Sequence, residues 1–227
     1  MILEVVTDRA RLCGTDADRR RVRQCVRRQA AYAVDAGVGL FQIREPGLEA
    51  GDLLALATEV VTVASGTSMR VVINDRLDVA LACGAAGVHL RQDSFPPSSV
   101  RSMTPSGFII GCSVHSVAGA VAAAGTADYL VAGTVWPSAS KPSGHRLLGL
   151  DGLAAIVRAV RVPVLAIGGV TLDRMPEVAK AGAAGVAAIE LFLGPTDEGS
   201  GVRCRAVDLA RLVETARARF DTSRSAS

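Results

Sequence analysis

Eight short apolar runs recur along the chain, and their spacing constrains the fold more than any other feature. The runs begin at Leu3, Leu40, Val71, Val88, Phe108, Tyr129, Val164 and Val186. The seven intervals between them average about 26 residues, close to the length of a strand with its returning helix. Runs that are apolar on both faces are typical of strands buried in a parallel sheet. The pattern therefore predicts eight βα units.

Segments with the apolar spacing of helices separate these runs, at residues 17–36, 50–65, 77–83, 98–103, 116–124, 150–160, 172–181 and 207–220. No G-x-G-x-x-G follows the first run, which argues against a dinucleotide-binding sheet. No polar linker divides the series either. We therefore expect an α/β fold, a single (β/α)8 TIM barrel with eight parallel strands over residues 1–220, and a flexible tail at 221–227.

The composition of the chain argues against nucleic-acid and membrane partners. The net charge of +3 is too small to indicate nucleic acid, and the arginine-rich stretch at 19–28 lacks interleaved aromatic residues. Five cysteines show no C-x-x-C pair and no zinc spacing, which favours reduced thiols. No apolar run approaches the ~18 residues of a membrane span, and no signal peptide opens the chain. We expect a cytoplasmic protein without nucleic-acid or membrane partners, whose outer helices offer surfaces for a homodimer.

The seventh apolar run ends in paired glycines, Gly168 and Gly169, and a second such run follows one helix later. Glycines let backbone N–H groups approach an anion closely. Late strands of (β/α)8 barrels build phosphate sites in this way. The alternative is an ordinary strand-to-helix turn.

Polar residues stand where the second and third runs end. Gln42 and Arg44 are two apart and so share a face, where an amide and a guanidinium can bind a diphosphate or a carboxylate. The alternative for Arg44 is an internal ion pair with a glutamate. Asn74 and Asp75 follow the third run, where a carboxylate suits a Mg²⁺ that bridges phosphates. Asn-Asp pairs also form common turns and helix caps.

The fourth and fifth runs add Asp93, a second carboxylate, with Ser113 and His115. The serine can donate to a phosphate and the histidine can transfer protons, although a lone histidine is often structural. The connection 133–149 has 17 residues rich in Pro, Ser and Gly and contains Lys141. Its length is typical of a lid or a substrate loop.

In this order and spacing, these segments resemble the thiamine-phosphate synthase / thiazole tautomerase family from Leu3 to about Leu193. The resemblance rests on the sequences VVTD at 5–8, QIRE at 42–45, INDR at 73–76, GVHL at 87–90 with Gln92, GCSVHS at 111–116, the loop 133–141 and IGGV at 167–170. The synthases of the family join hydroxymethylpyrimidine diphosphate to thiazole phosphate and release diphosphate. The resemblance implies this transferase activity and a Mg²⁺ cofactor, with small phosphorylated thiamine precursors as substrates.

The resemblance also implies roles for single residues. Gln42, Arg44 and Asn74 would bind the pyrimidine diphosphate, and Asp75 would hold Mg²⁺. Ser113 and Lys141 would contact the diphosphate that leaves. Gly169 would bind the thiazole phosphate. The remaining substrate-site positions are Gly168, Thr134, Ser138, Ile189 and Glu190, and the reactive groups are Arg44, Lys141, Ser113 and His115.

Four positions depart from the family pattern. Synthases carry a lysine where Pro46 stands and a second Mg²⁺ aspartate where Ser94 stands, so that Asp93, one position earlier, becomes the second metal candidate. A small residue is usual in place of Glu190, where a carboxylate repels an anion. The catalytic histidine of the tautomerases falls on Thr134.

We expect a synthase, and three alternatives stay open. The first is a tautomerase in which His115 or His89 moves the proton. The second is a barrel that binds a thiamine precursor without catalysis. The third is another phosphate-handling barrel, such as a sugar-phosphate epimerase.

Overall fold

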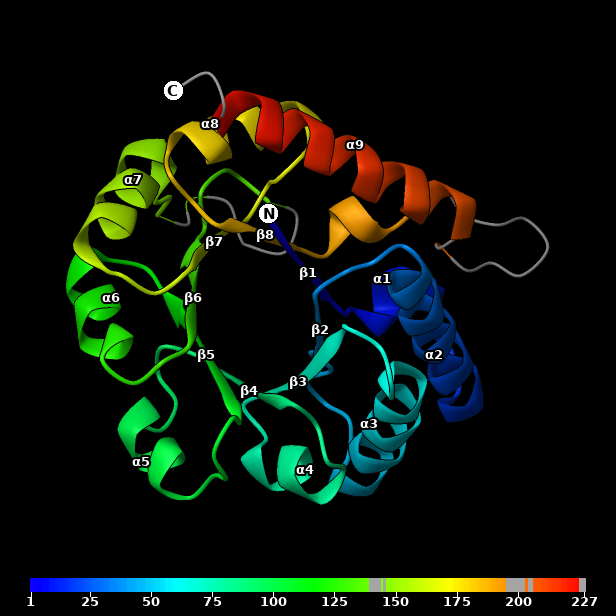
Figure 1. The fold of residues 1–227 in the computed structure, drawn as a ribbon. Coiled ribbons are helices and arrows are strands. Elements are labelled where there is room, and N and C mark those ends of the chain that lie inside the picture. Colours follow the sequence, from blue (N-terminus) through cyan, green and yellow to red (C-terminus); the bar gives the residue numbers. More distant parts are fainter. Residues whose placement is uncertain (139–143, 145, 195–202, 204–205, 225–227) are drawn as a thin grey trace. The chain divides into compact units, whose positions relative to one another are not determined.

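The computed structural model describes residues 1–138, 144, 146–194, 203 and 206–224. Strands and helices alternate along the chain (Figure 1). The strands are β1 (Ile2–Val6), β2 (Leu40–Ile43), β3 (Arg70–Asn74), β4 (Gly87–Leu90), β5 (Ile109–Val114), β6 (Tyr129–Gly133), β7 (Val164–Ile167) and β8 (Gly185–Ala188). The strand order is a closed barrel from β1 to β8, and the strand pairs with a described register are parallel. The expected TIM barrel is confirmed.

The helices are α1 (Arg9–Cys13), α2 (Arg19–Asp35), α3 (Ala50–Ala64), α4 (Leu77–Ala82), α5 (Pro97–Ser102), α6 (Val117–Ala124), α7 (Gly149–Ala159), α8 (Met175–Lys180) and α9 (Ala206–Arg224). Two short 3-10 turns, η1 (Leu172–Arg174) and η2 (Glu190–Phe192), follow β7 and β8. None of the described helices combines the length and the apolarity that crossing a membrane requires.

The sequence located each strand start within one residue, and the helix expected over 17–36 is present as α2, but α1 was not expected. The first helical segment was expected from residue 17, whereas the chain forms α1 before α2. Each of these two helices begins with an aspartate cap: Asp8 accepts from the Arg11 N–H (3.1 Å) and Asp18 from the Arg21 N–H (2.7 Å). The tail boundary expected at residue 221 falls inside α9, and residues 225–227 lie outside the described residues.

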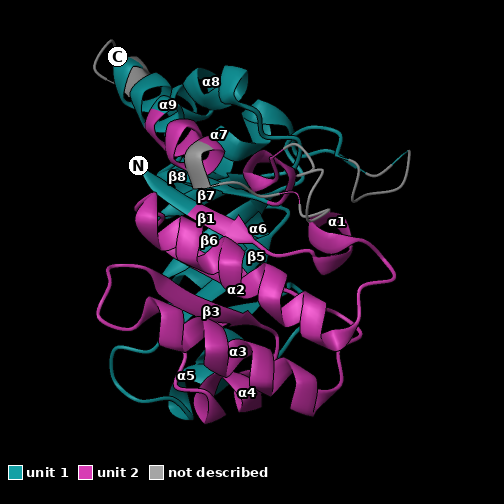
Figure 2. Ribbon diagram, turned by 90° about the vertical axis from the view of Figure 1, so that its right-hand side faces the viewer, with its two compact units in different colours: residues 1–3, 89–188, 215–227 teal, residues 4–88, 189–214 magenta. Residues whose placement is uncertain are grey.

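The chain divides into two compact units, coloured teal and magenta in Figure 2. Unit 2 comprises residues 4–88 and 189–214. In it α2 packs against α3 through apolar side chains such as Val26 and Leu56, both with 0% exposure. An ion pair between Arg19 and Asp52 (3.1 Å) joins the two helices at the surface. The arginine-rich stretch is therefore part of an amphipathic outer helix.

Unit 1 comprises residues 1–3, 89–188 and 215–227. Its core contains β5 to β8, whose centres carry Ile110, Leu130, Leu165 and Val186, each with 0% exposure. Because both faces of these strands are covered, the apolar runs show no polar alternation. The register sets Ser113 opposite Val131 and places the ends of β6 and β7 side by side. These strand ends position the polar groups of the unit.

Candidate active site

Unit 2 places Gln42 and Arg44 at the end of β2, where Thr7 fixes the backbone. The Thr7 N–H donates to the Gln42 carbonyl (3.0 Å), and the Thr7 hydroxyl accepts from the Arg44 N–H (2.9 Å). The Gln42 side chain is 4% exposed, and among the described residues its Nε2 has no hydrogen-bond acceptor. A buried donor left without an acceptor costs about 1–3 kcal/mol. An oxygen atom of a ligand would remove this penalty.

The next residue, Glu45, pairs with Arg9 and not with Arg44. Its carboxylate oxygens accept from the Arg9 backbone N–H (3.1 and 3.2 Å), and the Arg9 guanidinium lies 3.5 Å away. Burial raises the pKa of Glu45 above its ordinary value of 4.5, while hydrogen bonds from Thr7 and Arg9 partly oppose the shift. No carboxylate of the described residues lies within ion-pair distance of Arg44. The half-buried Arg44 guanidinium is therefore available to an anion.

A tight turn follows β3 at Asp75. Its φ of +59° is the one positive φ found outside glycine in the described part of the chain. The turn closes with a hydrogen bond of 2.8 Å from the Arg76 N–H to the Asn74 carbonyl. Aspartate tolerates the left-handed region better than most residues, yet such outliers gather at functional sites. The turn fixes the backbone from which the Asp75 side chain extends.

Arg76 then forms a two-pronged pair with Asp78, with distances of 2.8 and 2.6 Å. The Arg76 hydrogen bonds lower the pKa of Asp78 below its ordinary value. This pair is exposed and stands in the first turn of α4. Asp78 thus serves as a charged partner of Arg76 at the surface.

Ile189 and Glu190 follow β8 at the beginning of η2. The Glu190 carboxylate lies 3.4 Å from the Arg11 guanidinium and 2.8 Å from that of Arg203. Two guanidinium groups therefore neutralise the charge that was expected to repel an anion at this position. Glu190 remains 56% exposed, so each pair contributes little to stability.

Unit 1 places Ser113 on the wall of a cavity. The cavity measures about 330 Å³ and is lined by Gln92 and Ser94 after β4, by Ser113 of β5, and by α6 residues. Its volume is within the range of small-molecule sites. Asp93 is exposed, and both of its oxygens accept from Arg91 at 3.0 Å. A metal ion at Asp93 would have to displace this guanidinium.

His115 follows β5, and its Nδ1 contacts the Gly133 carbonyl oxygen. A carbonyl only accepts, so Nδ1 carries a proton, and in the neutral tautomer of the ring the lone pair is on Nε2. Thr134, after Gly133, is 5% exposed, and its carbonyl accepts from the Leu148 N–H (2.7 Å). Ser138 is half-buried. Lys141 lies outside the described residues, as do the other residues of 139–143 and residue 145 in the predicted substrate loop.

The paired glycines after β7 have φ values of +97° (Gly168) and +64° (Gly169), which favour glycine. A Cβ on Gly169 would lie 2.5 Å from the Pro137 carbonyl oxygen and 2.8 Å from Trp136 Cβ. Arg174 donates to the Gly169 carbonyl, and its guanidinium carbon lies 4.9 Å from the centre of the Trp136 ring. A cation thus stands beside a glycine turn that leaves no room for a side chain.

A metal ion would find few protein ligands. Within the described ranges, no three His, Cys, Asp or Glu side chains come close enough to hold one. Mg²⁺ commonly takes one or two carboxylates and fills its other positions with waters and substrate phosphates. Asp75 fits that mode of binding.

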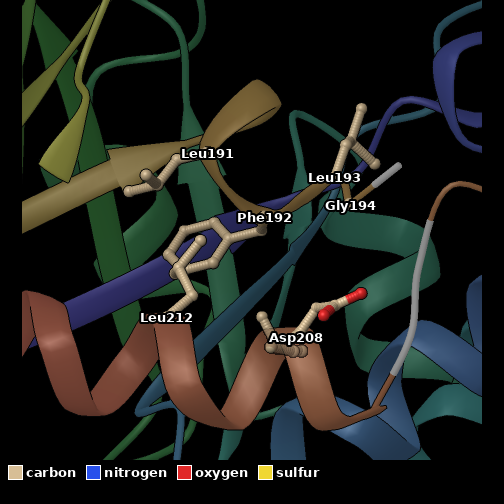
Figure 3. Close-up of a pocket in the computed structure, with 7 residues that line it drawn as sticks. Leu191, Phe192, Leu193, Gly194, Asp208 and Leu212 are labelled. Atoms are coloured by element: carbon tan, nitrogen blue, oxygen red, sulfur yellow. The ribbon is translucent and has the colours of Figure 1, made fainter.

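A second, much smaller cavity lies between η2 and α9 (Figure 3). It measures about 30 Å³, and Leu191, Phe192, Leu212 and Asp208 are among its lining residues. This volume accommodates one or two water molecules and no substrate. The cavity is therefore excluded as the active site.

The sequence reasoning missed the arginines that surround these positions. Arg9 and Arg11 pair with glutamates from distant parts of the chain, and Arg203 pairs with Glu190 across the loop after η2, so no helical or strand spacing marks these pairs. Arg174 had one usable signal, a cation five residues after Gly169.

The closed parallel strand order with alternating helices defines a (β/α)8 barrel, a fold whose enzymes carry their active sites at the carboxyl ends of the strands. The comparison with protein families is more specific. The model of the family described as "Thiamine monophosphate synthase" matches residues 12–192, and the chain belongs to this family.

Individual relatives agree with this assignment. The thiamine-phosphate synthase of Methanoculleus marisnigri is 39% identical over 175 residues, which cover 77% of this chain and 83% of the relative. That of Methanoregula boonei is 35% identical over 198 residues, covering 87% and 90%. Among solved structures, thiamine phosphate pyrophosphorylase from Pyrococcus furiosus matches with a TM-score of 0.75 and 30% identity. The match covers 98% of this chain and 96% of the Pyrococcus furiosus chain.

Proposed function

We infer that the chain is a thiamine-phosphate synthase that joins hydroxymethylpyrimidine diphosphate to thiazole phosphate and releases diphosphate. The observation that carries this inference is the family match over residues 12–192, which includes β2, β3, β5 and β7 with their polar ends. The first chemical event is the departure of diphosphate. It leaves a cation on the methylene carbon, which the aminopyrimidine ring stabilises.

In this proposal the end of β2 binds the diphosphate of the pyrimidine substrate. The buried Gln42 amide offers a donor without an acceptor among the described residues, and Arg44 has no carboxylate partner there. Asn74 adds an amide at the end of the neighbouring strand. These groups bind the negative charge that develops on the leaving group, which favours departure. Lys141, expected to neutralise the same charge, remains a proposal from the sequence.

Asp75 is the proposed Mg²⁺ ligand. The ion, when bound, would supply positive charge to the phosphate oxygens and lower the barrier to diphosphate departure. The tight turn holds the backbone at Asp75 in a defined conformation, from which the carboxylate would reach the ion. Asp93 would serve as a second ligand only after release of Arg91.

The turn after β7 is the proposed site of the thiazole phosphate. Gly168 and Gly169 leave backbone groups accessible, and Arg174 stands beside them. Thr134, Ser138, Ile189 and Glu190 are the remaining proposed contacts. Holding the thiazole ring in place makes its nitrogen a neighbour of the cation, so that capture does not depend on diffusion.

The test is to incubate the protein with both precursors and to measure thiamine phosphate. Asp75→Ala is expected to abolish Mg²⁺-dependent product formation. Asp78→Ala is the matched control, because it removes a carboxylate three residues away that is paired with Arg76, and it should keep most of the activity. Undiminished product formation in EDTA would refute the proposal.

One observation favours a second candidate, the tautomerase reaction of the same family. The contact of His115 Nδ1 with the Gly133 carbonyl leaves Nε2 as a base on an exposed side chain. In that case the protein would aromatise the thiazole tautomer without metal, and His115→Gln would stop it. A rate of aromatisation equal to the uncatalysed rate would refute the tautomerase function.

A further inference from the structure

A buried histidine joins two hydroxyl groups in unit 1, and the proposed reaction does not yet use it. His89 of β4 is 3% exposed. Its Nδ1 lies 3.1 Å from the Tyr129 hydroxyl and its Nε2 lies 2.9 Å from Ser113 Oγ. The imidazole and phenol rings are tilted by 45° with their centres 5.7 Å apart. Three strands, β4, β5 and β6, therefore contribute to one short chain of hydrogen bonds.

The neighbouring strand leaves room for this arrangement. A Cβ on Gly111 would overlap the ring of Tyr129 and lie 2.5 Å from its hydroxyl oxygen. The phenol, itself 3% exposed, occupies the space that a side chain at position 111 would take. Tyr129 is thus held in place beside His89, which is what a functional hydrogen-bond chain requires.

Ser113 connects this chain to the 330 Å³ cavity, because it contacts His89 and also lines the cavity wall. A serine hydroxyl has one proton to donate and lone pairs to accept with. The direction of the His89–Ser113 bond therefore decides what the serine presents to a ligand.

A neutral imidazole allows two directions. If Nδ1 donates to Tyr129, then Nε2 accepts the Ser113 proton, and the serine has only lone pairs for the cavity. If Tyr129 donates to Nδ1, then Nε2–H donates to Ser113 Oγ, and the serine proton is free to point into the cavity. Only the second direction suits an anion, whose oxygens accept and never donate.

We propose that His89 is a positioning residue that, together with Tyr129, makes the Ser113 hydroxyl a donor to the diphosphate. The inference rests on the proposed function and on the role that the family resemblance implies for Ser113, contact with the diphosphate. His89 itself does not contact the substrate. Its role is to fix the direction of the hydrogen bond with Ser113, and it is the Ser113 hydroxyl that contacts the substrate.

The test measures binding of inorganic diphosphate, with Mg²⁺, to the full-length protein by calorimetry. His89→Leu is expected to weaken binding about tenfold, the effect of losing one well-aligned hydrogen bond to a charged group. His89→Gln is expected to retain most of the affinity, because its amide N–H can replace Nε2–H. In a Ser113→Ala background, His89→Leu should change the affinity less than twofold, because the bond that it orients is gone.

A purely structural role for His89 predicts a different result. The substitution would then weaken diphosphate binding by the same factor in both backgrounds, and His89→Gln would give no rescue. Either result overturns the inference, as does unchanged affinity in His89→Leu. If that variant does not fold, Tyr129→Phe replaces it, with Tyr32→Phe as the control hydroxyl deletion. The expected outcome is a loss of about threefold for Tyr129→Phe alone, and no loss for Tyr129→Phe refutes the proposal.

Failure of the proposed function would look different from failure of this inference. If the wild-type protein neither forms thiamine phosphate nor binds diphosphate, both the proposed function and the inference about His89 are refuted. If the wild-type protein is active but the His89 and Ser113 substitutions act independently, only the inference is refuted.

Discussion

Replacing Gly169 with alanine tests the glycine turn after β7, because two separate penalties can be worked out. A left-handed φ costs an alanine ~1–2 kcal/mol, partly offset by ~0.4–1 kcal/mol from the stiffer unfolded chain. The new Cβ would also lie 2.5 Å from the Pro137 carbonyl and 2.8 Å from Trp136 Cβ. Backbone must shift to relieve these contacts, which adds about 1–3 kcal/mol.

Gly107 provides the matched control. Its φ is +80° and nothing lies within 4 Å of its Cβ position, so Gly107→Ala carries only the backbone penalty. We expect a loss of about 1 kcal/mol for Gly107→Ala and about 3 kcal/mol for Gly169→Ala. For a domain of this size the melting temperatures should fall by about 2–4 °C and about 6–12 °C.

Differential scanning fluorimetry and urea unfolding measure both variants, and steady-state kinetics measures the effect on substrate. Gly169→Ala should raise KM for thiazole phosphate, whereas Gly107→Ala should leave it unchanged. Equal melting temperatures for the two variants would refute the argument from close approach. An unchanged KM in Gly169→Ala would refute the assignment of the turn to the phosphate.

Three further predictions follow from single residues. Asp75→Gly should remain within about 1 kcal/mol of wild type in urea unfolding, because glycine adopts the φ of +59° freely, yet it should lose Mg²⁺-dependent activity; retained activity would contradict the metal role. Burial raises the pKa of Glu45, so its contribution to stability is complete below the ordinary pKa of 4.5 and is lost as pH rises through the higher folded value. Glu45→Gln should therefore flatten the fall in unfolding free energy above pH 4.5, and an identical pH profile would contradict the shift. Burial raises the pKa of Cys112 to about 12, so peptide mapping after alkylation at pH 8 should find this thiol modified only in unfolded protein.

Much of the fold could be predicted from the sequence because strands such as β7 and its neighbours are marked by local sequence patterns. An apolar run followed by Gly168–Gly169 predicts both a buried strand and a turn that needs positive φ, and the structure contains both. Helix α1 was missed because its five residues carry no repeating apolar face, and its aspartate cap is a common residue in turns too. The continuation of α9 past residue 221 was missed because the polar residues there resemble those of a frayed end.

The candidate site was readable only in part. The sequence predicted that Gln42, Asn74 and Ser113 lie at the ends of strands, and the structure has them there, because strand direction alone sets where such residues lie. Glu190 pairs with Arg11, which is far away in the sequence, and with Arg203, which lies across a loop. No local pattern announces these two cations, so the sequence alone predicts an unneutralised carboxylate that repels an anion. Likewise, the direction of a hydrogen bond depends on partners from three strands and has no sequence signature.

The most direct test of the account is to measure both products of the proposed reaction in one tube. With both precursors and Mg²⁺, the account predicts that thiamine phosphate and diphosphate form in equal amounts and that EDTA stops both. Aromatised thiazole phosphate without any release of diphosphate, or no product at all from folded protein, would contradict it.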